Sequence, residues 1–174
     1  MNPSFQTIFN AVERQRTEIL SQVKQLPPDR YMLQPSPAKW SIAQILTHLL
    51  TSEKLSVGYM KKKMLGIDQL HNSGMAGSLR FTLLQLSQRI PILKFRAPTV
   101  VMANTPQALP FDELTSQWDA LRSELKALLE SIEEKNVKKA IYKHPLAGRL
   151  DAAQATAFFY EHTHHHWPQI KRLL

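Results

Sequence analysis

The chain has 174 residues, a formal net charge of +8 at pH 7 and no cysteine. A chain of this length corresponds to one domain, so we expect a single domain spanning residues 1–174. The absence of cysteine excludes disulfide bonds, thiolate metal ligands and a cysteine nucleophile. Any metal ion must therefore be bound by nitrogen and oxygen atoms.

The composition also disfavours two classes of partner. No run of apolar residues approaches the roughly 18 needed for a membrane span, and the N-terminal region lacks the pattern of a secretion signal. We therefore expect no membrane partner and a cytoplasmic location. The basic residues are dispersed, apart from the run Lys61-Lys62-Lys63, and no nucleic-acid-binding motif accompanies them. The charge is better explained by a solvated basic surface than by nucleic-acid binding.

The first half of the chain contains two long segments with helical periodicity. Apolar residues recur at helical spacing over 4–26, and two consecutive prolines end the pattern. Residues 28–39 contain further prolines and predict an extended connection. A second helix is expected over 41–64, because Ser41 and Gln44 have the spacing of a capping box.

The middle of the chain, over 66–110, is harder to interpret. A shorter helix is expected over 78–90. Residues 91–110 contain four prolines and predict a long irregular crossover. A crossover of this length is either a lid over a pocket or a structural connection, and the sequence leaves both open. The apolar side of the short helix is expected to consist of Leu79, Leu83, Leu86 and Ile90.

The last third predicts two further long helices. One is expected over 111–135, and a turn through residues 144–148 follows it. A capping box begins at Asp151 and starts a last helix that is expected to run almost to residue 174. Pro168 predicts a kink or an early end near His165. The whole pattern predicts an all-α four-helix bundle with a long irregular crossover and a short extra helix in its middle.

Histidines are concentrated on two of the expected helices. On the last helix, His162 and His166 are four residues apart and share the face that carries the apolar residues. On the same helix, His164 points away from that face and His165 lies at its edge. His48 lies close to the apolar stripe of the second helix. Taken alone, His48 is best explained as a hydrogen-bonded core histidine.

Three inward-facing imidazoles together predict a metal site. Burial of their nitrogens is unfavourable unless a partner satisfies them, and a divalent metal ion does so directly. Three protein ligands also leave a position open for water or substrate. We therefore expect His48, His162 and His166 to bind one divalent metal ion. Imidazole is a ligand for zinc, nickel, copper and iron alike, so the ligand type does not select the metal.

Three segments of the chain carry a family resemblance. They are Trp40-Ser-Ile-Ala-Gln-Ile-Leu-Thr-His48-Leu, His144-Pro-Leu-Ala-Gly148-Arg-Leu and His162-x-x-His165-His166-x-x-Gln169-Ile170.

Together these segments resemble the DinB-like superfamily of metal-binding four-helix bundles, which includes YfiT-like proteins proposed to be metal-dependent hydrolases. The resemblance extends over the whole chain. It implies a metal held by His48, His162 and His166. The family contains thiol S-transferases, an isomerase, proposed hydrolases and many members of unknown activity, so fold and metal carry over better than chemistry.

The combined expectation is a metal-dependent hydrolase or thiol S-transferase that uses zinc or nickel at a three-histidine site. The substrate is expected to be a small molecule, and a low-molecular-weight thiol is the expected co-substrate of a transferase. The catalytic residues are unknown, and a solvent-facing polar role remains open for each candidate. The candidates for proton transfer or ligand orientation are Glu53, His165, Gln44 and Glu161.

Two other functional classes remain open. A non-catalytic metal-binding or protein-interaction module, such as a homodimer, binds metal without turnover. A nucleic-acid accessory protein binds DNA with a strong dependence on salt. The remaining large residues are expected to be packing anchors or core residues rather than site residues; they are Trp40, Trp118, Trp167, Met60 and Met64.

Overall fold

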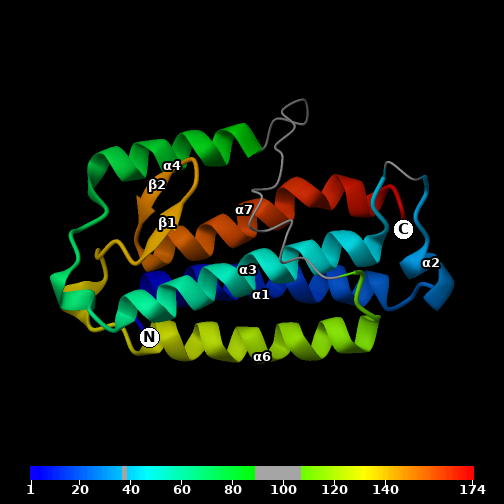
Figure 1. The fold of residues 1–174 in the computed structure, drawn as a ribbon, viewed down its shortest axis with the longest axis horizontal. Coiled ribbons are helices and arrows are strands. Elements are labelled where there is room, and N and C mark those ends of the chain that lie inside the picture. The colour runs from blue at the N-terminus through cyan, green and yellow to red at the C-terminus, as the bar shows by residue number, and fades with distance from the viewer. Residues whose placement is uncertain (37–38, 89–106) are drawn as a thin grey trace.

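The computed structural model describes residues 1–36, 39–88 and 107–174. Within these ranges, four long helices lie side by side (Figure 1). They are α1 (Pro3–Val23), α3 (Ile42–Met64), α6 (Phe111–Glu130) and α7 (Ala152–Lys171). Both α1 and α3 pack against α6 and α7. The predicted all-α four-helix bundle is confirmed.

Both predicted capping boxes are present. The Ser41 hydroxyl accepts a hydrogen bond from the Gln44 backbone N–H, and the Gln44 side chain accepts one from the Ser41 N–H. Asp151 and Gln154 make the same reciprocal pair at the start of α7. These bonds satisfy N–H groups that a helix start otherwise leaves unpaired. They therefore fix where the two histidine-bearing helices begin.

The core lies between the four long helices. Met60 and Trp118 are fully buried there, as predicted, whereas Trp40, Met64 and Trp167 are only partly buried. The largest fully buried side chains are Trp118, Phe5, Phe159, Ile42, Ile45, Leu46, Leu49, Met60, Leu114, Leu125, Leu129 and Ile141.

The sequence predicted an extended connection between α1 and α3, and this prediction is wrong in part. The connection contains the short helix α2 (Pro28–Met32). Pro28 takes the first helical position, where the missing N–H has no intrahelical role and the fixed φ suits a helix. Tyr31 is buried and donates a hydrogen bond to the Leu109 carbonyl, which fastens this connection to the segment before α6.

The short middle helix is present, and its expected apolar side, with Leu79, Leu83 and Leu86, is the exposed side. α4 (Gly74–Gln88) begins four residues earlier than expected and buries Phe81 and Leu84 against its neighbours, while Leu79, Leu83 and Leu86 are exposed. The helix lies outside the bundle, against α7 and a hairpin strand, so its contact face follows from that docking and not from the four-helix core. Ile90 and residues 91–106 of the predicted crossover lie outside the described residues.

The segment between α6 and α7 is more structured than the predicted turn. α6 ends at Glu130 rather than near residue 135, and the 3-10 helix η2 (Glu134–Asn136) follows it. Strands β1 (Tyr142–His144) and β2 (Gly148–Leu150) then form an antiparallel hairpin, in which Tyr142 pairs with Leu150. Gly148 has φ +77°, a conformation that favours glycine. A second 3-10 helix, η1 (Ile67–Gln69), lies between α3 and α4.

The last helix does not end near His165, so that alternative of the prediction is wrong. α7 continues through Pro168 to Lys171. Pro168 has no N–H to donate to the carbonyl of His164, which is the usual cost of proline inside a helix. His164 lies on the exposed side of α7, where water can donate a hydrogen bond to this carbonyl instead.

A search of the helices among the described residues finds none that combines the length and apolar character needed to cross a bilayer.

Candidate metal centre

The three predicted ligands meet at one place between α3 and α7. His48 projects from α3, and His162 and His166 project from one face of α7, one turn apart. His48 and His166 are buried and His162 is half-buried. Each residue offers a ring nitrogen, and these nitrogens all lie within 4.8 Å of one another. The three histidines form the only such group of potential ligands found among the described residues.

The spacing of two of these nitrogens suits a tetrahedral ion. Nε2 of His48 lies 3.3 Å from Nε2 of His162. Two imidazole ligands about 2.0–2.1 Å from a tetrahedral metal have nitrogens about 3.3–3.4 Å apart. The rings of His48, His162 and His166 meet edge to face, with centroids 5.0–5.2 Å apart. The three rings thus pack directly against one another around the converging nitrogens.

Burial keeps the three rings neutral at pH 7. Burial lowers the pKa of His48 to about 4. Burial, followed by the neighbouring His48, lowers the pKa of His166 to about 3. The pKa of His162 is also well below its ordinary value, because of burial and then the neighbouring His166 and His48. A neutral imidazole has a lone pair available, so a cation can bind without first displacing a proton.

Gln169 fixes the orientation of one ring. Nδ1 of His166 lies 3.2 Å from the Gln169 side-chain oxygen. Because an amide oxygen only accepts, Nδ1 carries the proton and Nε2 is left as the basic nitrogen. This is the arrangement that metal-binding histidines commonly have, with the second ring nitrogen donating to an outer acceptor. His48 differs, since its buried Nδ1 has no partner among the described residues.

Aromatic side chains enclose the cluster. Trp40 lies before α3, with its ring centroid 5.1 Å from that of His48 and 6.4 Å from that of His166. Phe158, one turn before His162 on α7, stacks on His162 at 5.4 Å. These rings place apolar surface against all three cluster histidines. Trp40 was predicted only as a packing anchor, because nothing in its spacing links it to the histidines.

His144 belongs to the surroundings of the cluster and was assigned no role from the sequence. Its Nδ1 accepts hydrogen bonds from the backbone N–H groups of Leu146 and Ala147, both at 3.1 Å. Its ring packs against Phe158 at 4.4 Å. Burial lowers the pKa of His144 to about 4. His144 therefore closes the hairpin turn as a neutral acceptor and supports the ring that stacks on His162.

Glu53 lies in a buried ion-pair network that joins three helices. Its carboxylate contacts Arg122 Nη1 at 2.6 Å and accepts a hydrogen bond from Trp118 Nε1 at 2.9 Å. Arg122 also pairs with Glu13, and Glu13 pairs with Arg16. These contacts occupy both Glu53 oxygens and tie α3 to α6 and α1. They give Glu53 a structural role.

The other three candidates lie in different surroundings. Gln44 caps α3 through its side chain. Glu161 is buried next to α4, where it accepts a weak hydrogen bond from Gln85 at 3.4 Å. His165 is half-buried, and its ring centroid lies 5.3 Å from that of His166. His165 therefore lies beside one of the cluster histidines.

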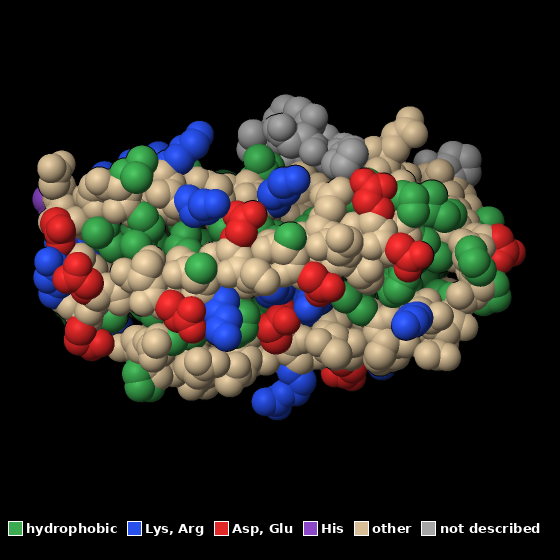
Figure 2. Space-filling view, turned by 90° about the horizontal axis from the view of Figure 1, so that it is seen from below, with side chains coloured by type: hydrophobic (Ala, Val, Ile, Leu, Met, Phe, Trp, Pro, Cys, Tyr) green, Lys and Arg blue, Asp and Glu red, His purple; other side chains and the backbone are tan. Residues whose placement is uncertain are grey.

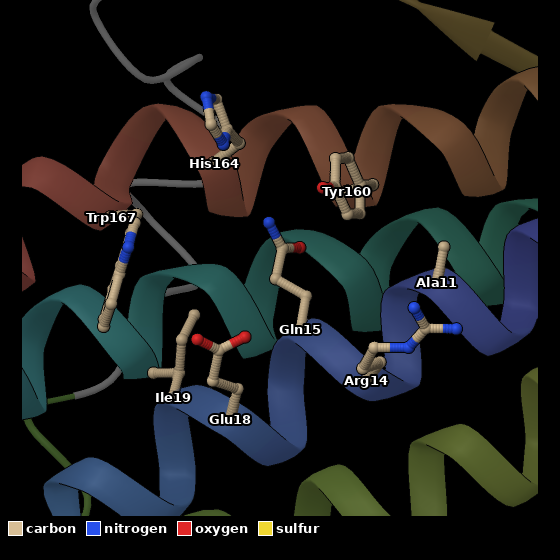
Figure 3. Close-up of a pocket in the computed structure, with 8 residues that line it drawn as sticks. All are labelled: Ala11, Arg14, Gln15, Glu18, Ile19, Tyr160, His164 and Trp167. Atoms are coloured by element: carbon tan, nitrogen blue, oxygen red, sulfur yellow. The ribbon is translucent and has the colours of Figure 1, made fainter.

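His164 lies away from the cluster, as predicted, and lines a separate cavity between α1 and α7. The cavity has a volume of about 290 Å³. Figure 3 shows His164, Tyr160 and Trp167 reaching it from α7, and Gln15 and its neighbours reaching it from α1. None of the three cluster histidines lines this cavity. It is therefore distinct from the candidate metal centre.

A family model described as the DinB superfamily matches residues 11–170, which include all three cluster histidines. No curated protein matches the chain.

Proposed function

The chain belongs to the DinB superfamily, and from this premise we propose that it binds one divalent metal ion through His48, His162 and His166. The observation that carries the proposal is the convergence of three ring nitrogens within 4.8 Å inside an aromatic enclosure. Burial of three neutral imidazoles with so few other partners is unfavourable without a ligand. The 3.3 Å separation of two Nε2 atoms suits a tetrahedral ion.

We propose zinc or nickel as the bound ion, and the donor set is compatible with both. All three donors are imidazole nitrogens, and borderline ions of this kind bind such ligands well. Three protein ligands leave a coordination position for a small molecule, which is typical of catalytic sites and not of closed structural ones.

We extend the proposal to catalysis of hydrolysis or thiol transfer on a small-molecule substrate, with a low-molecular-weight thiol as co-substrate for transfer. When bound, a divalent ion at such a site supplies Lewis-acid activation of a water molecule or a thiol. The chain itself contributes the orientation of His166 by Gln169 and the packing of Trp40 and Phe158 against the ligand rings. His165, beside His166, is the proposed proton-transfer group.

Elemental analysis of protein purified without a His tag tests the metal site. Wild-type protein reconstituted with zinc or nickel is expected to contain close to one equivalent of metal. His48→Ala, His162→Ala and His166→Ala are each expected to lose most of it. His164→Ala is the matched control, because it removes an imidazole from the same helix on the opposite face. Equal metal content in all four variants would reject the ligand assignment.

Turnover distinguishes an enzyme from a metal-binding module. Metal-loaded protein is assayed for ester and amide hydrolysis and for conjugation of low-molecular-weight thiols to electrophiles. Catalysis at this site is supported if His162→Ala is inactive and if added metal or added thiol does not restore its activity. Stoichiometric metal without turnover in any assay would favour the non-catalytic alternative.

Gln169→Leu is expected to weaken metal binding about 10- to 100-fold, because loss of an outer hydrogen bond to a ligand histidine has effects of this size. Chelator competition measures the affinity. Gln169 is exposed, so the variant should unfold at nearly the wild-type temperature. Gln169→Glu keeps an acceptor at the same place and is expected to retain affinity. Equal loss in both variants would show that the hydrogen bond to His166 is not what matters.

A further inference from the structure

The cavity between α1 and α7 has opposite charges at its two ends. Its volume of about 290 Å³ is just below the roughly 300–1,000 Å³ of ordinary ligand pockets, so it admits only a small molecule. The two helices run in the same direction (Figure 1), and lining residues follow one another along both. In Figure 3, Arg14 lies toward the end near Tyr160, and Glu18 lies toward the end near Trp167.

Gln15 places an unpaired acceptor in the same cavity. It lies between the two charged residues on α1, and its side chain reaches toward α7 (Figure 3). Its side-chain oxygen Oε1 is buried and accepts no hydrogen bond from any residue that the structure describes. Buried polar atoms nearly always have a partner, so an unpaired one calls for an explanation. A ligand N–H group in the cavity supplies the missing donor.

The two charges at the ends of the cavity are also unpaired. Arg14 and Glu18 are exposed and one helical turn apart, yet neither forms an ion pair with the other or with another described residue. On the side of α6, by contrast, Figure 2 shows basic side chains interspersed with acidic ones. The cavity therefore offers a free cation, a free anion and, between them, a free acceptor.

The spacing of these three groups matches a dipeptide. Four residues of an α-helix rise by about 6 Å. The amino and carboxyl groups of a single amino acid are only about 2.5 Å apart, whereas the two ends of an extended dipeptide are about 6–7 Å apart. A dipeptide also has one peptide N–H between its charged ends, just as Gln15 lies between Arg14 and Glu18.

We propose that this cavity binds a dipeptide. The N-terminal ammonium group of the dipeptide pairs with Glu18, and its C-terminal carboxylate pairs with Arg14. Its peptide N–H donates to Oε1 of Gln15. Each charged end thus meets a charge of opposite sign, and the buried acceptor gains its donor.

The walls of the cavity indicate which side chains fit. At the Glu18 end, Ile19 is buried and Trp167 is half-buried, with Nζ of Lys171 5.7 Å from the centroid of the indole ring. The first residue of the dipeptide is therefore expected to have a large apolar side chain. Leu-Ala is a suitable probe, because it places such a side chain first and a small one second.

Isothermal titration calorimetry with Leu-Ala tests the proposal, with a chelator present so that the peptide cannot bind through a metal ion. The expected dissociation constant is below about 1 mM. N-acetyl-Leu-Ala lacks the ammonium charge, and Leu-Ala amide lacks the carboxylate. Each is expected to bind at least about tenfold more weakly. Free leucine, which lacks the spacing and the peptide N–H, is expected to bind at least as weakly as these derivatives.

Two outcomes of this titration would overturn the proposal. If Leu-Ala does not bind at millimolar concentration, the cavity holds water alone. If free leucine binds as tightly as Leu-Ala, the ligand is a single amino acid.

Two variants assign the ends of the ligand. Glu18→Gln is expected to bind Leu-Ala at least about tenfold more weakly and to bind N-acetyl-Leu-Ala as well as Leu-Ala. Arg14→Gln is expected to lose the preference for Leu-Ala over its amide in the same way. Both side chains are exposed, and thermal unfolding checks that the variants are folded. If acetylation weakens binding equally in the wild type and in Glu18→Gln, the proposed binding mode is wrong.

Gln15→Leu removes the central acceptor. It is expected to weaken binding of Leu-Ala about 2- to 10-fold, which is the usual effect of one neutral hydrogen bond. The free variant is expected to unfold at the wild-type temperature or above, because the oxygen that it loses is buried and unpaired. Unchanged affinity in this variant would contradict the contact with the peptide N–H.

Lys24→Gln is the matched control for charge. Lys24 is an exposed residue at the end of α1 and does not line the cavity, so the variant is expected to bind Leu-Ala like the wild type. Weakening equal to that in Arg14→Gln would reduce the effect to net charge and overturn the proposal. His162→Ala is also expected to bind normally, because His162 does not line this cavity. Binding that depends on His162 would place the peptide at the metal centre instead.

Discussion

Replacement of Glu53 by alanine is expected to lower the free energy of unfolding by about 3–5 kcal/mol, which is the usual result of removing one member of a buried ion pair. The change leaves Arg122, which is 4% exposed, without its partner on α3. It also leaves the indole N–H of Trp118 without an acceptor. Chemical denaturation monitored by circular dichroism measures the loss.

Glu124→Ala is the control for this prediction. Glu124 pairs with Lys61 across the same two helices, α3 and α6, but both side chains are more than half exposed. Exposed pairs contribute about 1 kcal/mol or less. The double variant Glu53→Leu/Arg122→Met is expected to be less destabilised than Glu53→Ala, because no buried charge is left unpaired. If Glu53→Ala and Glu124→Ala lower the free energy of unfolding equally, the buried network does not stabilise the fold. The structural role assigned to Glu53 would then be wrong, and Glu53 would again be a candidate for proton transfer.

The elements that the sequence predicted well are those whose signals are local. Ser41 and Asp151 each precede a glutamine by three residues, and the structure has a capping box at both places. His162 and His166 are one helical turn apart, so their common face follows from helix geometry alone. Their meeting with His48 required only that two apolar stripes face one core.

The predictions that failed depended on docking. The apolar pattern of α4 did not reveal which side would be buried, because Phe81 and Leu84 lie on one side and Leu79 and Leu83 on the other. Docking against α7 and the hairpin selects the first side. The hairpin itself was missed because each strand has only three residues, too few for a recognisable alternation.

Residues that act through a ligand histidine were also hard to identify. Gln169 follows His166 by three residues, a spacing at which helix side chains can meet, and this signal was available in the sequence. Trp40 contacts the cluster, and His144 contacts Phe158 beside it, each from outside the helices that carry the ligands, so no periodicity links them to the ligands. Their roles depend on the tertiary structure.

Acidification is expected to destabilise the metal-free protein partly through His144. Burial lowers the pKa of His144 to about 4 from an ordinary value of 6.5, so the unfolded chain takes up the proton first as the pH falls. The contribution of the neutral His144 ring to the free energy of unfolding is therefore fully present above pH 6.5. It is lost between about pH 6.5 and pH 4. A shift of this size corresponds to about 3 kcal/mol.

His144→Asn isolates this effect. The asparagine side-chain oxygen can accept the N–H groups of Leu146 and Ala147 in place of Nδ1, but it does not titrate. Loss of the ring contact with Phe158 lowers the stability of the variant at every pH, so only the slope of stability against pH is compared. The total fall in the free energy of unfolding between pH 6.5 and pH 4 is expected to be smaller in the variant by up to about 3 kcal/mol.

The other buried histidines are present in both proteins, so their contributions largely cancel in the difference; His144 is the smallest of the causes that lower the pKa of His162. His164→Asn, on an exposed position of α7, is the control and is expected to leave the slope unchanged. Denaturation is measured with a chelator present, so that metal release does not add to the pH dependence. Parallel curves for wild type and His144→Asn would mean that His144 is protonated as readily in the folded chain as in the unfolded one. The hairpin turn would then not depend on a neutral ring beside Phe158.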